Sequence, residues 1–206
     1  MTNRRGVVAA IHVAAALLLA FALALAGCGR EGPQFRASDV TGSSFGRELA
    51  LTDHNGKART LADFRGKVVV LFFGYTQCPD VCPTTLATLA EAKKRLGPDG
   101  DKVQVLFVTI DPERDKPALL LPYVTAFDPS FLGLYGDADA TARTAKEFKI
   151  IYQKQPGPTP ETYTMDHSAG TFVFDPEGRL RLYVGHGQDA EFFAHDLKLL
   201  LPSATS

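Results

Sequence analysis

Two cysteines, Cys78 and Cys82, are separated by three residues in the segment GYTQCPDVCPTTL at residues 74–86. Side chains at positions i and i+4 of a helical turn face the same side, so two sulfurs at this spacing can chelate one ion. Thiolate is the form of cysteine that binds metal and also the form that attacks a disulfide. The pair therefore predicts either a soft-metal site, for Cu(I) or Zn, or a redox-active dithiol.

A closed structural disulfide is the ordinary alternative for a cysteine pair in an exported chain. A link across so short a loop removes little entropy from the unfolded chain, which is worth about 2 to 3 kcal/mol or less on the chain-entropy model. A chain of 206 residues with 45% hydrophobic residues has enough apolar core to fold without that link. We therefore favour a reactive or metal-binding role for both cysteines.

A third ligand candidate, His167, lies in the segment DHSAGTFVFDPEGRL at residues 166–180. Histidine often completes a site that two thiolates leave open. In a thioredoxin-like sheet, the loop that enters the final hairpin passes over the turn that would carry the cysteines. Asp166 is a candidate to orient the His167 ring through a hydrogen bond. His186 and His195 are expected to pack at the core edge or face solvent.

Two acidic segments could be mistaken for metal sites. The DPERD segment at residues 111–115 is better explained as a turn at a strand end in which Arg114 pairs with a carboxylate. Asp137 and Asp139 lack the glycine and the downstream glutamate of a calcium loop, so we expect them at the start of a helix.

The cysteines follow a strand and open a helix. Residues 67–74 (KVVVLFFG) form a continuous apolar, β-branched and aromatic run, which predicts a central strand buried on both faces. Residues 83–96 show helical spacing of apolar side chains, with Gly97 and Pro98 as a stop. Free N–H groups and the helix dipole at this junction are expected to lower a thiol pKa.

The remaining pattern alternates strands and helices, which predicts an α/β fold with a central mixed sheet flanked by helices. Asn55 and Gly56 between two extended runs predict an N-terminal β-hairpin, with His54 as a turn residue and not a ligand. The other expected elements are strands at residues 103–110 and 149–154, helices at 117–127, 137–148 and 189–201, and a hairpin of residues 170–175 and 179–185.

The N-terminus has the order of parts of a secretory signal. Basic residues precede an apolar run at residues 7–26, and Ala26 and Gly27 come directly before Cys28. This resembles a bacterial lipoprotein signal, in which Cys28 becomes the acylated mature N-terminus; an uncleaved signal anchor is the alternative. We expect a signal peptide at residues 1–27, a flexible tether at 28–44 and one domain at 45–206.

Three motifs in order resemble the Sco (SenC/PrrC) family of copper chaperones: GYTQCPDVCPTTL, TIDPERDKP at residues 109–117, and DHSAGTFVFDPEGRL. The resemblance implies a thioredoxin-like fold with an added N-terminal hairpin. It also implies one copper ion per chain, as Cu(I) with Cu(II) as a second form, held by Cys78, Cys82 and His167. Gln77 departs from the histidine that many members have before the first cysteine.

The resemblance further implies partners: the copper-site subunit of cytochrome c oxidase, a periplasmic copper donor, and a membrane through the Cys28 lipid. The expected location is the periplasmic side of a bacterial membrane, with the inner membrane favoured. A net charge of −1 without a basic block indicates no nucleic-acid partner. A thiol-disulfide oxidoreductase or redox sensor using Cys78 and Cys82 is the alternative function. A peroxidase on the same fold is a weaker alternative, because the sequence lacks the surroundings expected of a peroxidatic cysteine.

Overall fold

The computed structural model describes residue 12 and residues 32–159 and 162–202. The chain divides into two units, Met1–Gln34 and Phe35–Ser206, and all the strands and helices given below belong to the second unit. The expected signal peptide and Cys28 lie outside the described residues. Among the residues that are described, no helix is both long enough and apolar enough to cross a membrane.

Eight of the described strands form one sheet with the order β1-β10-β9-β4-β5-β6-β2-β3. The central strand β4 runs parallel to β5 and antiparallel to β9, so the sheet is mixed, as predicted. All residues of β4 and β5 are buried, in agreement with their continuous apolar runs. The strands are β1 Ser38–Asp39, β2 Leu51–Asp53, β3 Ala58–Arg59, β4 Val68–Gly74, β5 Val103–Thr109, β6 Leu132–Tyr135, β9 Thr171–Phe174 and β10 Leu180–Val184.

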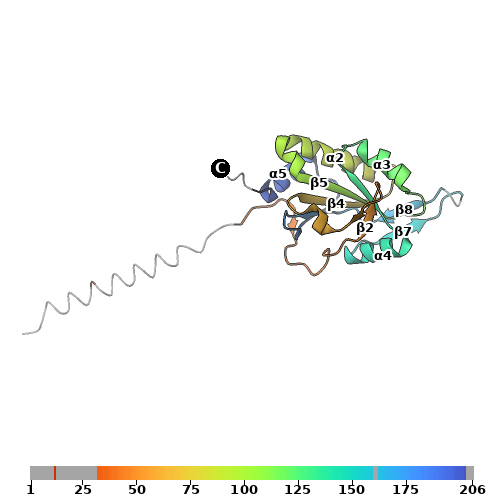
Figure 1. The fold of residues 1–206 in the computed structure, drawn as a ribbon, viewed down its shortest axis with the longest axis horizontal. Coiled ribbons are helices and arrows are strands. Elements are labelled where there is room, and N and C mark those ends of the chain that lie inside the picture. Colours follow the sequence, from red (N-terminus) through yellow and green to blue (C-terminus); the bar gives the residue numbers. More distant parts are fainter. Residues whose placement is uncertain (1–11, 13–31, 160–161, 203–206) are drawn as a thin grey trace, which may run out of the picture. The chain divides into compact units, whose positions relative to one another are not determined.

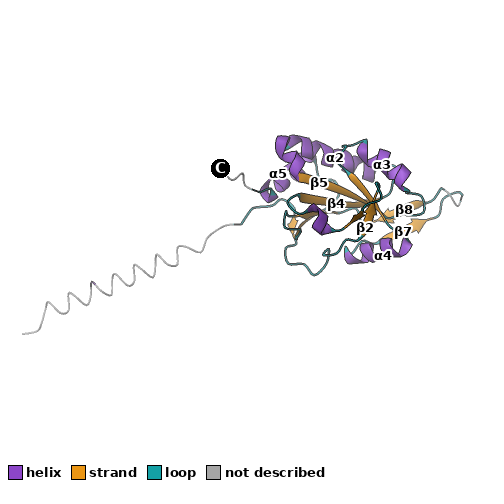
Figure 2. Cartoon of the chain, in the orientation of Figure 1, coloured by secondary structure: helices purple, strands orange, loops and turns teal. Residues whose placement is uncertain are grey.

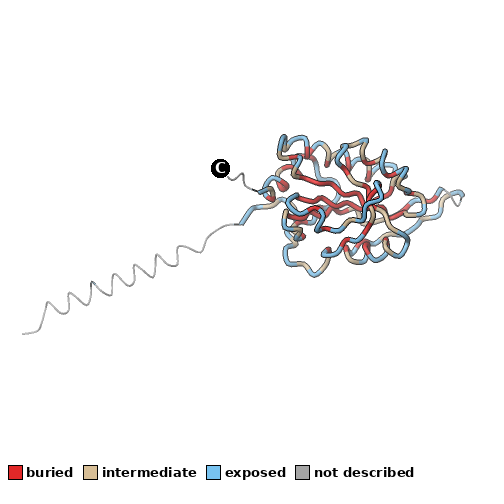
Figure 3. Tube along the Cα trace, in the orientation of Figure 1, coloured by how far each residue is buried: buried red, intermediate tan, exposed pale blue. Residues whose placement is uncertain are grey.

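Helices cover both faces of this sheet, with α2 and α3 on one side and α4 on the other (Figures 1 and 2). Their buried faces meet the strands, while their outer faces are exposed (Figure 3). Asp137 and Asp189 cap α4 and α5 by accepting hydrogen bonds from the backbone N–H groups of Ala140 and Phe192. The helices are α2 Val81–Arg95, α3 Pro117–Thr125, α4 Ala138–Glu147 and α5 Ala190–Leu200, with 3-10 turns η1 Leu61–Phe64 and η2 Gly97–Lys102.

The N-terminal hairpin is confirmed by the antiparallel pairing of β2 and β3. The turn residue His54 is buried, and its Nδ1 accepts a hydrogen bond from the Gly133 N–H at 3.1 Å. Gly133 belongs to β6, a strand that sequence patterning did not predict. Its four residues, LGLY, are too few to show a period, and β6 forms because β5 and β2 lie on either side of it.

A second, two-stranded sheet pairs β7 Tyr152–Gln155 with β8 Thr164–His167. The strand expected at residues 149–154 therefore exists, shifted by three residues at its start, but it lies outside the eight-stranded sheet. His167 was expected in a loop and is instead the last residue of β8, directly opposite Tyr152. In Figure 1, β7 and β8 lie together at one end of the folded unit.

The folded unit begins at Phe35, ten residues before the boundary that the sequence suggested. The backbone N–H groups of Arg36 and Ala37 donate to the carboxylate of Asp196 at 2.9 and 2.8 Å, and β1 pairs with β10. Asp196 is only 2% exposed, so its buried oxygens need these donors as hydrogen-bond partners. The expected tether at residues 28–44 is thus wrong for residues 35–44.

Candidate metal centre

Cys78 and Cys82 lie where β4 ends and α2 begins. Cys82 is fully buried in the first turn of α2, and Cys78 is half-buried in the preceding turn. Neither thiol is in a disulfide. The Cys82 backbone N–H donates to the Cys78 sulfur at 3.5 Å, so that sulfur occupies the place of a cap at the positive end of the helix.

Gly74, the last residue of β4, makes room for the buried thiol. A Cβ atom at this position would lie 2.7 Å from the Cys82 Sγ and 2.8 Å from Cε2 of Phe107. Real Cβ atoms do not approach other heavy atoms this closely, so any side chain here would move the sulfur. The glycine in the motif is therefore needed for close packing and not for a turn.

The two thiols have opposite pKa shifts. The hydrogen bond from the Cys82 thiol, followed by backbone N–H donors at Asp80 and Cys82, lowers the pKa of Cys78 to about 5 against the cost of burial. The pKa of Cys82 is raised, first by its hydrogen bond to Cys78 and then by burial. At neutral pH the pair therefore holds one thiolate, on Cys78, and one proton, on Cys82.

We expect this asymmetry to appear in the pH dependence of alkylation. With the reduced protein and iodoacetamide, the rate at Cys78 should be flat above about pH 6 and should fall tenfold per pH unit below its pKa of about 5. Mass spectrometry at each pH locates the label, and Cys82 should react far more slowly. Cys82→Ala, which removes the thiol donor, should move the midpoint upward.

The same shift has a defined sign for stability. The pKa of Cys78 is lowered on folding from 9.0, so its contribution is complete above pH 9 and is lost as the pH falls toward about 5. Urea unfolding of the reduced protein should therefore show stability rising from pH 5 to 9. A midpoint of Cys78 alkylation near 9 would contradict both expectations.

The His167 ring is held with one nitrogen toward the thiols. Its Nδ1 lies 3.0 Å from the Ser168 carbonyl oxygen, which can only accept, so Nδ1 carries the proton. In the neutral ring of this tautomer, Nε2 is the nitrogen with a free lone pair, and it lies 3.8 Å from the Cys82 Sγ. The rings of Phe72 and Tyr75 each pack edge-on against the imidazole at 6.3 Å between centroids.

The separation between Cys82 and His167 suits a shared ion. Sulfur and nitrogen ligands bind a metal such as zinc at about 2.3 and 2.0 Å, which puts two such ligands of one ion about 3.5 to 3.8 Å apart. No group of three His, Cys, Asp or Glu side chains in the described part of the chain is assembled closely enough to hold an ion as it stands. Cys82 and His167 are therefore the pair whose separation fits one ion, and the Cys78 sulfur, which accepts from the Cys82 N–H, is the third candidate ligand.

The sequence model described as SCO1/SenC matches residues 37–201, which include both cysteines and His167. The chain belongs to the SCO1/SenC family. Solved structures of similar fold include copper-bound ScoI of Bradyrhizobium japonicum, with 40% identity, a TM-score of 0.71 and coverage of 77% of this chain and 100% of that one. Copper-bound yeast Sco1 has 33% identity, a TM-score of 0.69 and coverage of 76% and 87%.

Among curated SCO1/SenC relatives, the mitochondrial SCO2 homologue of Mus musculus is 36% identical over 73% of this chain and 60% of its own length. The SCO2-like protein of Rickettsia felis is 33% identical over 65% of this chain and 66% of its own length. The chain thus spans 55 to 60% of the mammalian relatives from mouse, cattle and human.

Asp166 and two further histidines of this SCO1/SenC protein, His186 and His195, were also considered near the site. Asp166 does not orient His167, because its carboxylate accepts from the Gln155 side chain at 2.8 Å. Adjacent strand residues point to opposite faces, and the Ser168 carbonyl takes the expected role. His195 pairs with Asp196 on α5, and His186 lies in the loop after β10.

The DPERD turn is confirmed, since the Arg114 Nε pairs with the buried Asp111 carboxylate at 2.5 Å. This turn makes more long-range hydrogen bonds than its sequence predicts. The fully buried Asp115 accepts from the Thr76 hydroxyl and N–H, and from the Thr109 hydroxyl. These bonds join residues far apart in the chain, and only the order of the motifs gave a sign that they meet.

Proposed function

We propose that this protein binds one copper ion as cargo and passes it to the copper-site subunit of cytochrome c oxidase. Cys78, Cys82 and His167 are the proposed ligands. The observation that carries the proposal is the Nε2 of His167 at 3.8 Å from the Cys82 sulfur, with Nδ1 turned toward the Ser168 carbonyl oxygen. Support also comes from the copper-bound Sco proteins of Bradyrhizobium japonicum and yeast, at 40% and 33% identity.

The ligand set suits transfer as well as binding. Cu(I) binding releases the Cys82 proton, and the two resulting thiolates favour Cu(I). A neutral imidazole leaves more easily than a thiolate, because its departure separates no negative charge from the cation. His167 releases first, and the sulfurs hold Cu(I) until thiolates of the acceptor replace them. Cu(II) is a second form, in which the harder imidazole ligand matters more.

A transfer experiment tests this function. The Cu(I)-loaded protein is mixed under anaerobic conditions with the apo, reduced soluble domain of the oxidase copper-site subunit, and native mass spectrometry follows the metal. We expect copper to move to the acceptor domain, because thiolates of the acceptor can replace the donor ligands one at a time. Copper that stays on the donor at equilibrium would contradict delivery.

The asymmetry of the two thiols favours thiol-disulfide exchange as the second candidate. The half-buried Cys78 thiolate attacks a partner disulfide and forms a mixed disulfide, releasing one partner thiolate. The buried Cys82, after losing its proton, attacks Cys78 and releases the second partner thiol, leaving a Cys78–Cys82 disulfide. In the transfer assay, an oxidised acceptor domain that becomes reduced without gaining copper would identify this activity.

We also propose that Cys28 is lipidated and anchors the domain on the periplasmic side of the inner membrane, where a periplasmic donor supplies copper. The support is the order of basic, apolar and small residues before Cys28. Labelled palmitate should enter the wild-type chain and not a Cys28→Ala variant. Equal labelling of both chains would refute the anchor.

A further inference from the structure

The DPERD turn, residues 111–115, is fixed to the turn that carries Cys78. Asp115 is 1% exposed and accepts from the Thr76 N–H at 3.0 Å and the Thr76 hydroxyl at 2.5 Å. Thr76 precedes Cys78 by two residues. Any movement of the DPERD turn is therefore transmitted to the backbone beside the first thiol.

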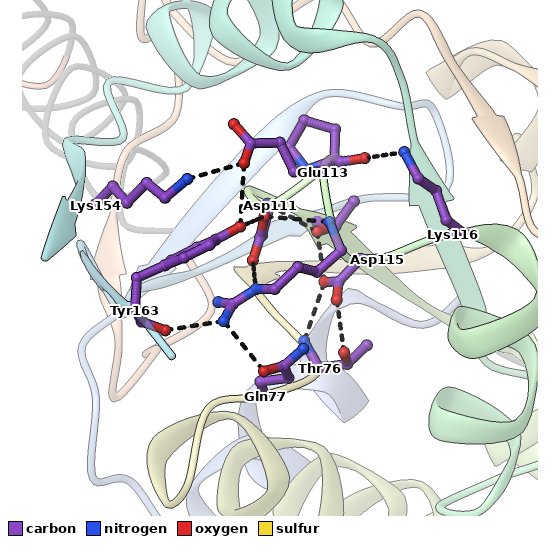
Figure 4. Close-up of polar contacts among 11 residues, drawn as sticks. Thr76, Gln77, Asp111, Glu113, Asp115, Lys116, Lys154 and Tyr163 are labelled. Carbon is purple, nitrogen blue, oxygen red and sulfur yellow. Dashed lines mark hydrogen bonds and ion pairs between the residues drawn. The ribbon is translucent and has the colours of Figure 1, made fainter. Parts of the chain in front are cut away.

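The DPERD turn also makes contacts with the β7–β8 sheet, in which His167 is the last residue of β8. The Tyr163 hydroxyl donates to Asp111 at 2.7 Å, and Lys154 of β7 pairs with Glu113 at 2.8 Å. Figure 4 shows Tyr163 and Lys154 facing Asp111 and Glu113, with Gln77 on the far side of Tyr163 from Lys154. Isolated two-stranded sheets are marginally stable, so these ties matter for the position of β8.

Arg114 connects all three parts. Its guanidinium pairs with Asp111 through Nε, while Nη1 donates to the Tyr163 carbonyl at 2.9 Å and to the Gln77 Oε1 at 3.1 Å. The group also lies 3.5 Å from the centroid of the Tyr163 ring, and its side chain is only 13% exposed. One cation thus joins the cysteine turn at Gln77 to the residue that directly precedes β8.

We propose that Arg114 is a positioning residue for the copper site, which sets the spacing between Cys78 and His167. The inference rests on the proposed copper-binding function. Tyr163 is followed by the four residues of β8, and a short strand moves as a unit, so a shift at Tyr163 reaches His167. A planar guanidinium can meet the carboxylate, the carbonyl and the amide oxygen together, whereas the point charge of a lysine cannot.

The first test compares Cu(I) affinities of the reduced protein by competition with a chromogenic chelator. Arg114→Met should weaken Cu(I) binding about tenfold or more. The Cu(I) affinity of Arg114→Lys should lie between that of Arg114→Met and that of the wild type. Arg59→Met is the matched control, because Arg59 also pairs with a buried aspartate, Asp53, at 2.8 Å and lies over an aromatic ring, Phe64. It should stay within twofold of the wild type.

A double-variant cycle separates positioning from general loss of stability. If Arg114 acts through His167, adding Arg114→Met to the His167→Ala variant should lower the Cu(I) affinity by less than twofold. X-ray absorption of the copper-loaded Arg114→Met protein should show fewer nitrogen ligands at an unchanged sulfur count. The same tenfold loss in both backgrounds, or wild-type affinity in Arg114→Met, would overturn the inference.

Tyr163→Phe covers the case in which Arg114→Met fails to fold. This variant keeps the ring under Arg114 and removes only the hydroxyl, which donates to Asp111 at 2.7 Å and to Glu113 at 3.4 Å. We expect a loss of Cu(I) affinity of about threefold that also vanishes in the His167→Ala background. Wild-type affinity in Tyr163→Phe would count against the inference. A wild-type protein that binds no Cu(I) would instead refute the proposed function itself.

Discussion

Replacing both thiols, as Cys78→Ser with Cys82→Ser, is expected to lower the Cu(I) affinity by at least about a thousandfold. Thiolate sulfur is the soft ligand that selects Cu(I), and a serine hydroxyl is a hard ligand that stays protonated at neutral pH. His167 alone would then remain of the three proposed ligands. Competition with a chromogenic Cu(I) chelator measures the change.

Thr85→Ala is a matched control for this double variant. Thr85 lies in α2 three residues after Cys82 and is buried. Its hydroxyl donates to the Val81 carbonyl of the same helix at 2.8 Å. The control disturbs the first turns of α2 without removing a sulfur, so its copper affinity should be unchanged. Binding by the double serine variant at wild-type strength would exclude the cysteines as ligands.

His167→Ala is expected to weaken copper binding about a hundredfold or more while leaving the Cys78–Cys82 disulfide potential within about 15 mV of the wild type. Removing a residue that only orients a metal ligand already lowers metal affinity about 10 to 100-fold, so removing the ligand itself should lower the affinity at least as much. His167 ranks below the Cys82 thiol and the backbone N–H groups of Asp80 and Cys82 among the groups that lower the pKa of Cys78, which is why the potential should barely move.

This pair of measurements separates the two candidate functions. A copper chaperone requires His167, whereas thiol-disulfide exchange between the two cysteines does not. His195→Ala is the control, since His195 pairs with Asp196 on α5 and contacts neither thiol. Unchanged copper affinity in His167→Ala would show that the third ligand is assigned wrongly, and a large shift in potential would point to a redox role for the imidazole.

The parts of the fold with strong local patterns were predicted from sequence. The apolar runs of β4 and β5 gave the buried centre of the sheet, and the pattern after Cys82 gave α2. Placing both cysteines at the junction of β4 and α2 required nothing more. The four-residue strand β6 was missed because its partners, and not its own composition, make it a strand.

The surroundings of the site depend on contacts between distant residues, which a single sequence does not reveal. Asp166 was assigned to His167 because it is adjacent in the chain, but in β8 the two side chains point to opposite faces. The polar stretch before Phe45 suggested a tether, although the buried Asp196 draws Arg36 and Ala37 into the fold. Arg114 was expected to pair with a carboxylate, but its bridge to Gln77 and Tyr163 was not foreseen.

The most direct test of the copper site is an anaerobic Cu(I) titration of the reduced domain, followed by X-ray absorption of the loaded protein. Convergence of Cys78, Cys82 and His167 on one ion predicts one copper per chain with two sulfur ligands and one nitrogen ligand. A different stoichiometry, or a coordination shell without the nitrogen, would contradict it.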